Sequence, residues 1–294
     1  MKVFFLMIFF LQSCVLYGTP DVRLAFDIGT GKIKMQVVKV TGTQIETLYY
    51  QSEATSLVGK SLLDGNNMIS KEGEERIITI LQALKFTGEQ YAPTSHTAIA
   101  TELFRKAGNG QKIIEEIANL LNMEIRIISP EEEGILGFLT IVKESDLASE
   151  NIIVLDIGSG SFQITCKIDG RLRVYSTPYG RFPMHEMLIQ NDFSALDTAL
   201  KNISPEIINK IRCSEGAVIG IGAHPKQVLK LNCSYTMNDL LRALEANPDV
   251  SLDRSDLILM KKIMEFLDIS RINFLGTQAG ITGGIFIKQL EKAG

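Results

Sequence analysis

The chain has 294 residues, of which 45% are hydrophobic and 22% are charged, enough for one large domain or two of about 130 to 150 residues. Its formal net charge of -4 leaves no basic surplus for the phosphate backbone of a nucleic acid. No run of Lys and Arg interleaved with aromatic residues occurs in it, so a nucleic-acid polymer is not expected as a partner.

Residues 1–18 differ in composition from the rest and are predicted to be an export signal. One lysine precedes the apolar run at residues 3–11, which is too short to span a bilayer but suits the hydrophobic region of a secretory signal. Leu11-Gln12-Ser13-Cys14 is similar to the lipobox of bacterial lipoproteins. We therefore expect an exported protein on the periplasmic side that a lipid on Cys14 anchors to the membrane. The alternative is a degenerate signal in front of a cytoplasmic protein.

Strands and helices alternate from Asp21 onward. Three strands joined by tight turns are predicted first, followed by two segments with helical periodicity, each leading to a short apolar strand. The predicted strands are residues 22–26, 34–40, 44–53, 96–100 and 124–128, and the predicted helices are residues 74–84 and 111–122.

The second half of the chain repeats this plan. Strands are predicted at residues 152–155, 162–168 and 172–176, with helices and a strand at 216–219 after them. The polar segment 143–151 has no apolar periodicity and is predicted to be a linker. The sequence therefore predicts an α/β protein with two domains, residues 21–143 and 151–294, facing a cleft.

One short pattern occurs in both halves. Residues 24–35 read LAFDIGTGKIKM and residues 153–164 read IVLDIGSGSFQI, so Asp27 and Asp156 each end a strand and precede a turn of small residues. Small residues let successive backbone N–H groups point at a bound anion. A single such turn is common, but two at corresponding places favour a phosphate site. The predicted phosphate ligands are Gly29, Thr30, Gly31 and Lys32 in the first turn and Gly158, Ser159, Gly160 and Ser161 in the second.

The two aspartates have a predicted role of their own. A carboxylate at the end of each strand is placed to hold a hydrated divalent cation between the phosphates. Asp27 and Asp156 are therefore predicted to bind Mg²⁺ or another divalent cation.

The chain resembles the exopolyphosphatase and guanosine pentaphosphate phosphohydrolase (Ppx/GppA) family of the actin, Hsp70 and sugar-kinase superfamily. The two turns resemble that superfamily's phosphate loops. Three further segments resemble family segments in the same order: IATELFRKAGNG at residues 99–110, IISPEEEGILGF at 127–138 and STPYGRFPMHE at 176–186. The resemblance implies two ribonuclease H-like domains of the actin-like ATPase kind, facing an interdomain cleft.

The resemblance also implies roles for two charged residues. Glu133 is in register with the family's catalytic glutamate, which would orient or deprotonate the attacking water. The alternative is that it complements the dipole of a helix that begins in the capping box at Ser129–Glu132. Arg105 would hold a phosphate with its planar, charged fork, or it is a surface cation on a loop.

The chain departs from the family pattern at several places. Lys32 stands where the first loop usually has Ser, and Gln163 stands where the second usually has Glu, which removes a charge and would weaken the hold on a divalent ion. The family's Gly-x-Ser-Gly-Thr turn appears as GIGAHP at residues 220–225. Its Gly-Leu-Arg-Glu-Gly appears as GITGG at residues 280–284, so a cleft Arg and Glu are missing.

We expect a Mg²⁺-dependent phosphohydrolase that removes the terminal phosphate from inorganic polyphosphate or guanosine pentaphosphate. Two alternatives remain open at this point. One is a family member that binds these anions without turnover, and the other is an ATP-dependent kinase of the same superfamily. The overall acidic charge makes a short substrate more plausible than a long chain. A homodimer is left open.

Overall fold

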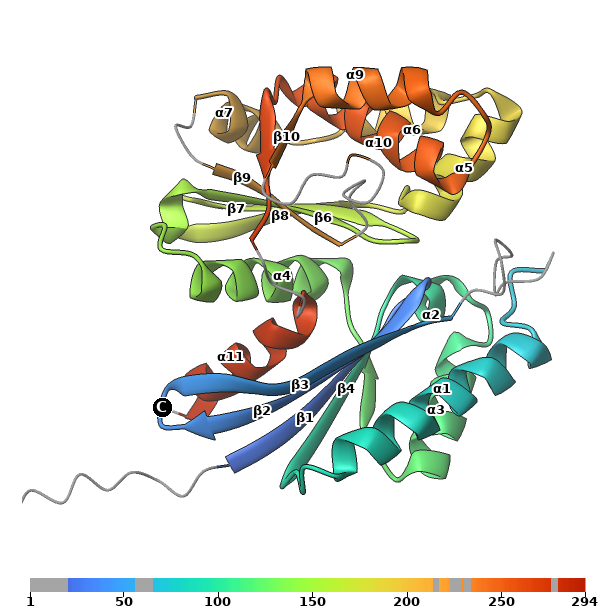
Figure 1. Ribbon diagram of the computed structural model, residues 1–294, viewed down its shortest axis with the longest axis vertical. Coiled ribbons are helices and arrows are strands. Elements are labelled where there is room, and N and C mark those ends of the chain that lie inside the picture. The colour runs from blue at the N-terminus through green and yellow to red at the C-terminus, as the bar shows by residue number, and fades with distance from the viewer. Residues whose placement is uncertain are drawn as a thin grey trace, which may run out of the picture.

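The structure is a computed structural model of the protein (Figure 1). It describes residues 21–55, 66–213, 217–222, 229, 234–275 and 280–293. The predicted signal at residues 1–18, with Cys14, lies outside the described residues, as do residues 223–225 of the GIGAHP turn. Within the described ranges, no helix combines the length and the apolar character that crossing a membrane requires.

The first half is built on a five-stranded sheet with the order β3-β2-β1-β4-β5. Its central strand β1 pairs antiparallel with β2, which pairs antiparallel with β3, and β1 pairs parallel with β4 on the other side. The predicted three-stranded meander is confirmed. The strands are β1 (Asp21–Ile28), β2 (Lys32–Thr41), β3 (Gln44–Ala54), β4 (Ser95–Ala100) and β5 (Ile125–Ile127).

The second half repeats this topology around β6. Strand β6 pairs antiparallel with β7 and parallel with β9, within a sheet of order β10-β11-β9-β6-β7-β8. Asp27 and Asp156 are each the residue before the last one of the central strand, so the sequence repeat is also a structural repeat. The strands are β6 (Ile152–Ile157), β7 (Phe162–Ile168), β8 (Arg171–Thr177), β9 (Ala217–Gly222), β10 (Ser234–Thr236) and β11 (Arg271–Asn273).

Helices α1 (Lys71–Glu89) and α3 (Gly110–Leu121) cover the outer face of the first sheet (Figure 1). Their apolar faces form one buried cluster with β1 and β2. Helix α1 begins before the predicted range 74–84, where Ser70 caps it, its side chain accepting a hydrogen bond from the Gly73 amide at 3.1 Å. It also continues past that range, to Glu89. The short helix α2 (Glu102–Lys106) connects β4 to α3.

The outer face of the second sheet is covered by the remaining group of helices, drawn above it in Figure 1. Together with β6 and β7 they bury the largest apolar cluster among the described residues. These helices are α5 (Arg181–Gln190), α6 (Ser194–Lys201), α7 (Pro205–Cys213), α9 (Met237–Ala246) and α10 (Leu252–Leu267).

Two helices, α4 (Pro130–Glu144) and α11 (Ile281–Ala293), lie between the sheets (Figure 1). Ile281, Ile285 and Phe286 of α11 are buried with residues of β1, β2 and β4. The C-terminal helix therefore packs on the first sheet, and the predicted second domain, residues 151–294, contains a helix that belongs to the packing of the first half. The predicted linker 143–151 begins inside α4 and ends in a 3-10 turn at Ser149–Asn151.

Candidate active site

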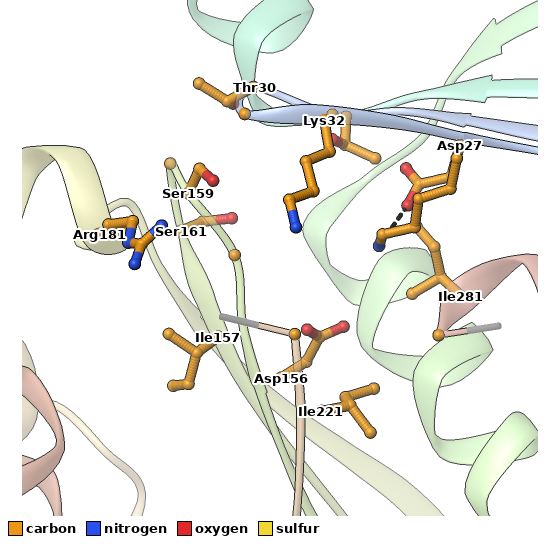
Figure 2. Close-up of a pocket in the computed structure, with 18 of the residues that line it drawn as sticks. Asp27, Thr30, Lys32, Asp156, Ile157, Ser159, Ser161, Arg181, Ile221 and Ile281 are labelled. Atoms are coloured by element: carbon orange, nitrogen blue, oxygen red, sulfur yellow. Dashed lines mark hydrogen bonds and ion pairs between the residues drawn. The ribbon is translucent and has the colours of Figure 1, made fainter. Parts of the chain in front are cut away.

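A cavity of about 510 Å³ lies between the two halves, at the end of the central strands. It is lined by residues of both repeated turns, by Asp27 and Asp156, and by Glu133 from the first turn of α4. Figure 2 shows Thr30 and Lys32 of the first turn beside Ser159 and Ser161 of the second. The fold therefore brings the predicted phosphate-binding turns, the predicted cation ligands and the predicted catalytic glutamate into one space.

The two turns have the same backbone hydrogen bond. The Gly29 amide donates to the carbonyl oxygen of Lys32 at 3.0 Å, and the Gly158 amide donates to that of Ser161 at 2.8 Å. The turns also touch one another, because a Cβ on Gly31 would lie 2.1 Å from Ser159 Oγ. Glycine at position 31 is thus required by the close approach of the second turn.

Asp27 is paired with Lys34, which is not one of the predicted site residues. Lys34 lies directly opposite it in the β1–β2 register, and the Lys34 ammonium is 2.8 Å from Asp27 Oδ2. Burial opposes the charge on Lys34, but the carboxylates of Asp27 and Asp156 raise its pKa above the ordinary value. Lys34 therefore stays charged and neutralises Asp27, which is itself only 3% exposed.

Asp156 has a different environment, since its carboxylate accepts no side-chain hydrogen bond from the part of the chain that the structure describes. Burial raises its pKa to about 6, with the charge of Lys34 opposing the rise and that of Asp27 adding to it. The residue opposite Asp156 in the β6–β7 register is Gln163. Its amide nitrogen donates to Ser161 and Ser176, and its buried Oε1 has no described partner.

The residues present fit a divalent cation of the kind that the resemblance implies. Mg²⁺ is commonly bound by one or two carboxylates, with water and substrate phosphate oxygens as the other ligands. Asp156 offers a carboxylate without a donor, and Asp27 also lines the cavity. Gln163 has an unpartnered Oε1 opposite Asp156 in the strand register, but it is not among the residues that line the cavity. Among the described residues, no group of three or more His, Cys, Asp or Glu could enclose a metal ion. Water and phosphate would have to complete its coordination.

Glu133 is 8% exposed and forms an ion pair with Arg105. Burial raises the pKa of Glu133 to about 7, against the opposing charge and hydrogen bond of Arg105. The negative charges of Asp156 and Asp27 add to the rise. A carboxylate with a pKa near neutrality can accept a proton from water and release it again at physiological pH.

The contacts of Arg105 differ from the predicted one, a direct contact with phosphate. Its guanidinium donates to Glu133 and to Glu102, both at 2.8 Å, and to the carbonyl oxygen of Ile128 at 2.8 Å. It is not among the residues that line the cavity. In this structure Arg105 therefore holds Glu133 in place from behind the cavity wall.

Ser129 begins α4 as predicted, and its side chain accepts a hydrogen bond from the Glu132 amide at 3.0 Å. The reciprocal half of the predicted capping box does not form, because the Glu132 carboxylate pairs instead with Arg126 and Lys288. Glu132 thus points away from the cavity, and Glu133, the next residue around the helix, lines it.

Arg181, the first residue of α5, also lines the cavity and was missed by the sequence analysis. Its position directly after Gly180, in a segment that follows the second turn, is the only signal that could have pointed to it. Its guanidinium pairs with Asp256 of α10, which is 2% exposed. Burial raises the pKa of Asp256 to about 6, although Arg181 opposes the rise.

The described lining of the cavity is acidic. It contains six carboxylates and three basic side chains. The carboxylates belong to Asp27, Glu102, Glu133, Asp156, Asp253 and Asp256, and the basic groups to Lys32, Lys34 and Arg181. Backbone N–H groups of the two turns and a cation brought from solution are therefore needed to hold a polyanion here.

Comparison with known proteins identifies a family and a fold for this chain. The family model described as the Ppx/GppA phosphatase family matches residues 35–263 of the chain, a range that includes the second turn and Glu133 and begins after the first turn. The chain is similar to the Ppx-GppA enzyme of Aquifex aeolicus, with a TM-score of 0.71 and 16% identity over 92% of this chain and 99% of that one.

Two further solved structures are similar over nearly their whole length. An exopolyphosphatase from Cytophaga hutchinsonii has a TM-score of 0.69 and 16% identity, covering 92% of this chain and 98% of that one. An exopolyphosphatase-like protein has a TM-score of 0.73 and 16% identity, covering 94% and 99%. At such low identity these likenesses show the fold, and they confirm the predicted α/β class with two repeated domains.

Proposed function

Because the chain belongs to the Ppx/GppA phosphatase family, we propose that it hydrolyses the terminal phosphoanhydride bond of inorganic polyphosphate or guanosine pentaphosphate. The observation that supports the proposal most directly is that both repeated turns and Glu133 line one cavity. The turns offer backbone donors to phosphate oxygens, and the glutamate offers a base for water.

In the proposed reaction, Glu133 receives a proton from the attacking water. The water oxygen forms a bond to the terminal phosphorus, and the bond from that phosphorus to the bridging oxygen breaks. The bridging oxygen leaves on the shortened chain, and inorganic phosphate is released. Arg105, at 2.8 Å from Glu133, fixes the direction of the carboxylate, which matters because proton transfer requires hydrogen-bond geometry.

Charge must be balanced before a polyanion can enter so acidic a cavity. Lys32 contributes an ammonium group that makes no ion pair with any described residue, and the amides of the two turns contribute partial positive charge. A divalent cation bound by Asp27 and Asp156 would neutralise the phosphate oxygens and the carboxylates together. We therefore propose that turnover depends on Mg²⁺ or a similar ion.

One observation favours a second candidate, a family member that binds phosphate chains without turnover. Gln163 replaces a carboxylate opposite Asp156, so the cation is held by fewer charges than the family pattern implies. This candidate predicts binding of polyphosphate with no release of phosphate.

The experiment is phosphate release by the purified protein, with Mg²⁺ and with a chelator. The substrates are short polyphosphate, long polyphosphate and guanosine pentaphosphate, and an Asp156→Asn variant is measured beside the wild type. Mg²⁺-dependent release that the variant loses supports the hydrolase. Binding of these anions without release from any of them would support the second candidate instead.

We also propose that the protein is exported and carries a lipid on Cys14, a proposal that rests on residues 1–18 of the sequence alone. Incorporation of labelled fatty acid into the wild type, and its loss in Cys14→Ser, would support it. An unlabelled protein recovered from the cytoplasm would contradict it.

A further inference from the structure

We propose that Arg181 forms a distal phosphate subsite in the cavity, which takes the phosphates that follow the terminal one in a phosphate chain. This inference rests on the proposed function, because it assumes that the substrate is a chain of phosphates held by the two turns. It assigns a ligand to a residue that has no role in the hydrolytic step described above.

Arg181 is fixed to the second turn by its own backbone. Its amide donates to the carbonyl oxygen of Gly158 at 3.2 Å, and the neighbouring Phe182 amide donates to that of Ser159 at 2.9 Å. A Cβ on Gly180 would lie 2.4 Å from the Gly158 carbonyl oxygen, so the start of α5 is pressed against the turn. Any phosphate that the second turn binds is therefore near the backbone of Arg181, from which the side chain extends.

The guanidinium of Arg181 is held from one side only. Its Nε donates to both carboxylate oxygens of Asp256, at 2.9 and 3.0 Å, and its Nη2 pairs with Asp256 and, at 3.5 Å, with Asp253. Its Nη1 donates to no acceptor in the described part of the chain. Because the side chain lines the cavity and is 28% exposed, this amino group is available to a ligand there.

The positions of the basic side chains in the cavity indicate where the subsite lies relative to the two aspartates. In Figure 2, Asp27 lies on one side, Arg181 on the other, and Lys32 with Ser159 and Ser161 between them. The Lys34 ammonium is committed to Asp27. Lys32 and Arg181 are thus the cations that can meet further phosphates of a chain whose terminal phosphate lies near the aspartates.

An Arg that is bound so closely to a buried Asp could instead serve only to tie α5 to α10. The same pair of helices has a second contact that allows the two roles to be separated. His185 of α5 lies 3.0 Å from the Ser255 hydroxyl of α10, and neither residue lines the cavity. His185→Ala is therefore a matched control that loosens this helix pair without removing a cation from the cavity.

The test measures binding, by calorimetry in Mg²⁺, of pyrophosphate, tripolyphosphate and long-chain polyphosphate to the wild type, Arg181→Met and His185→Ala. We expect Arg181→Met to lower the affinity for long-chain polyphosphate by about 10-fold or more, as loss of a charged hydrogen bond does. Its affinity for pyrophosphate should stay unchanged, and His185→Ala should match the wild type for all three ligands. Equal weakening for all ligands in Arg181→Met, or no weakening, would overturn the proposal.

Binding separates this proposal from the proposed function. If no ligand is hydrolysed but the loss of affinity in Arg181→Met still grows with chain length, the proposed hydrolase activity is wrong and the proposed subsite stands. If the wild type and the variant both release phosphate, with equal KM at every chain length, the subsite fails and the hydrolase stands. Should Arg181→Met not fold, Arg181→Lys keeps the charge but not the fork, and the same length-dependent loss is expected from it.

Discussion

Lys34 and Gln163 occupy equivalent positions in the two halves of the protein. Lys34 lies opposite Asp27 in the β1–β2 register, and Gln163 lies opposite Asp156 in the β6–β7 register. The repeat has therefore diverged at one place: the first aspartate has an ammonium partner at 2.8 Å, and the second has a neutral amide that donates to serines instead.

This asymmetry predicts that Gln163→Glu increases the affinity for Mg²⁺. A carboxylate there would add a second negative oxygen donor beside Asp156, which a divalent cation prefers to an amide. The Mg²⁺ concentration that gives half-maximal phosphate release should fall several-fold, whereas Gln44→Glu, at the exposed start of β3, should leave it unchanged. An unchanged Mg²⁺ dependence in Gln163→Glu would contradict the placement of the cation at Asp156.

A second prediction concerns stability against pH. The pKa of Glu133 in the folded protein, about 7, lies above its ordinary value of 4.5, so the folded state binds this proton more tightly than the unfolded state. In the absence of Mg²⁺, the free energy of unfolding should therefore fall as the pH rises from about 4.5 to about 7.

Glu133→Gln removes the carboxylate whose ionisation destabilises the folded protein. It should therefore stabilise the protein at pH 8 by up to about 3 kcal/mol. Thermal or urea unfolding across this pH range measures it. A wild type and a variant with parallel stability profiles would show that Glu133 does not titrate in this window.

The Arg105–Glu133 ion pair gives a third prediction. Arg105 opposes the rise in the pKa of Glu133, so Arg105→Met should raise that pKa further and move the rising limb of the kcat–pH profile to higher pH. It should also cost about 3 kcal/mol of stability, because Glu133 loses its partner in a largely buried place and Glu102 keeps only Lys106, at 3.2 Å.

The matched control for Arg105 is Arg126→Met. Arg126 pairs with Glu132, and its side chain is 51% exposed, so its removal should leave both the pH profile and the stability nearly unchanged. If Arg105→Met lowered phosphate release without moving the pH profile, Arg105 would act on the phosphate and not through Glu133.

The contact between the two turns gives a fourth prediction. In Gly31→Ala, the added Cβ would lie 2.1 Å from Ser159 Oγ and 2.7 Å from Ser159 Cβ, so the turns must separate. We expect a loss of about 1–3 kcal/mol of stability. The double variant Gly31→Ala, Ser159→Gly removes both clashing atoms and should recover most of it. If the losses of stability from Gly31→Ala and Ser159→Gly simply added up in the double variant, as thermal unfolding would show, the turns would not touch in solution.

Much of the site could be predicted from the sequence because its geometry is local. Asp27 and Asp156 each follow a buried apolar run and precede a turn of small residues, so the strand end, the turn and the carboxylate are all encoded within a dozen residues. Two copies of this pattern in one chain then predict a duplicated fold. The start of α4 was predictable for the same reason, since Ser129 and Pro130 carry a local capping signal.

The rest depends on contacts between distant segments. Arg105 carries no sign in its own segment that Glu133, on another helix, would occupy its guanidinium. The guanidinium of Arg181 is held at the cavity wall by Asp256, which lies seventy-five positions later in the chain. The position of α11 could not be predicted for the same reason. Its pattern of apolar residues would allow packing on either sheet, and the contacts with β1, β2 and β4 show that it packs on the first.

The most direct test of the account compares phosphate release by Glu133→Gln and Glu132→Gln in saturating Mg²⁺. The two residues are neighbours at the start of the same helix, but Glu133 lines the cavity and Glu132 pairs with Lys288 and Arg126 outside it. We predict that kcat falls by about 100-fold or more in Glu133→Gln, as loss of a general base does, and stays near the wild-type value in Glu132→Gln. Equal activity in the two variants would contradict Glu133 as the base that activates water.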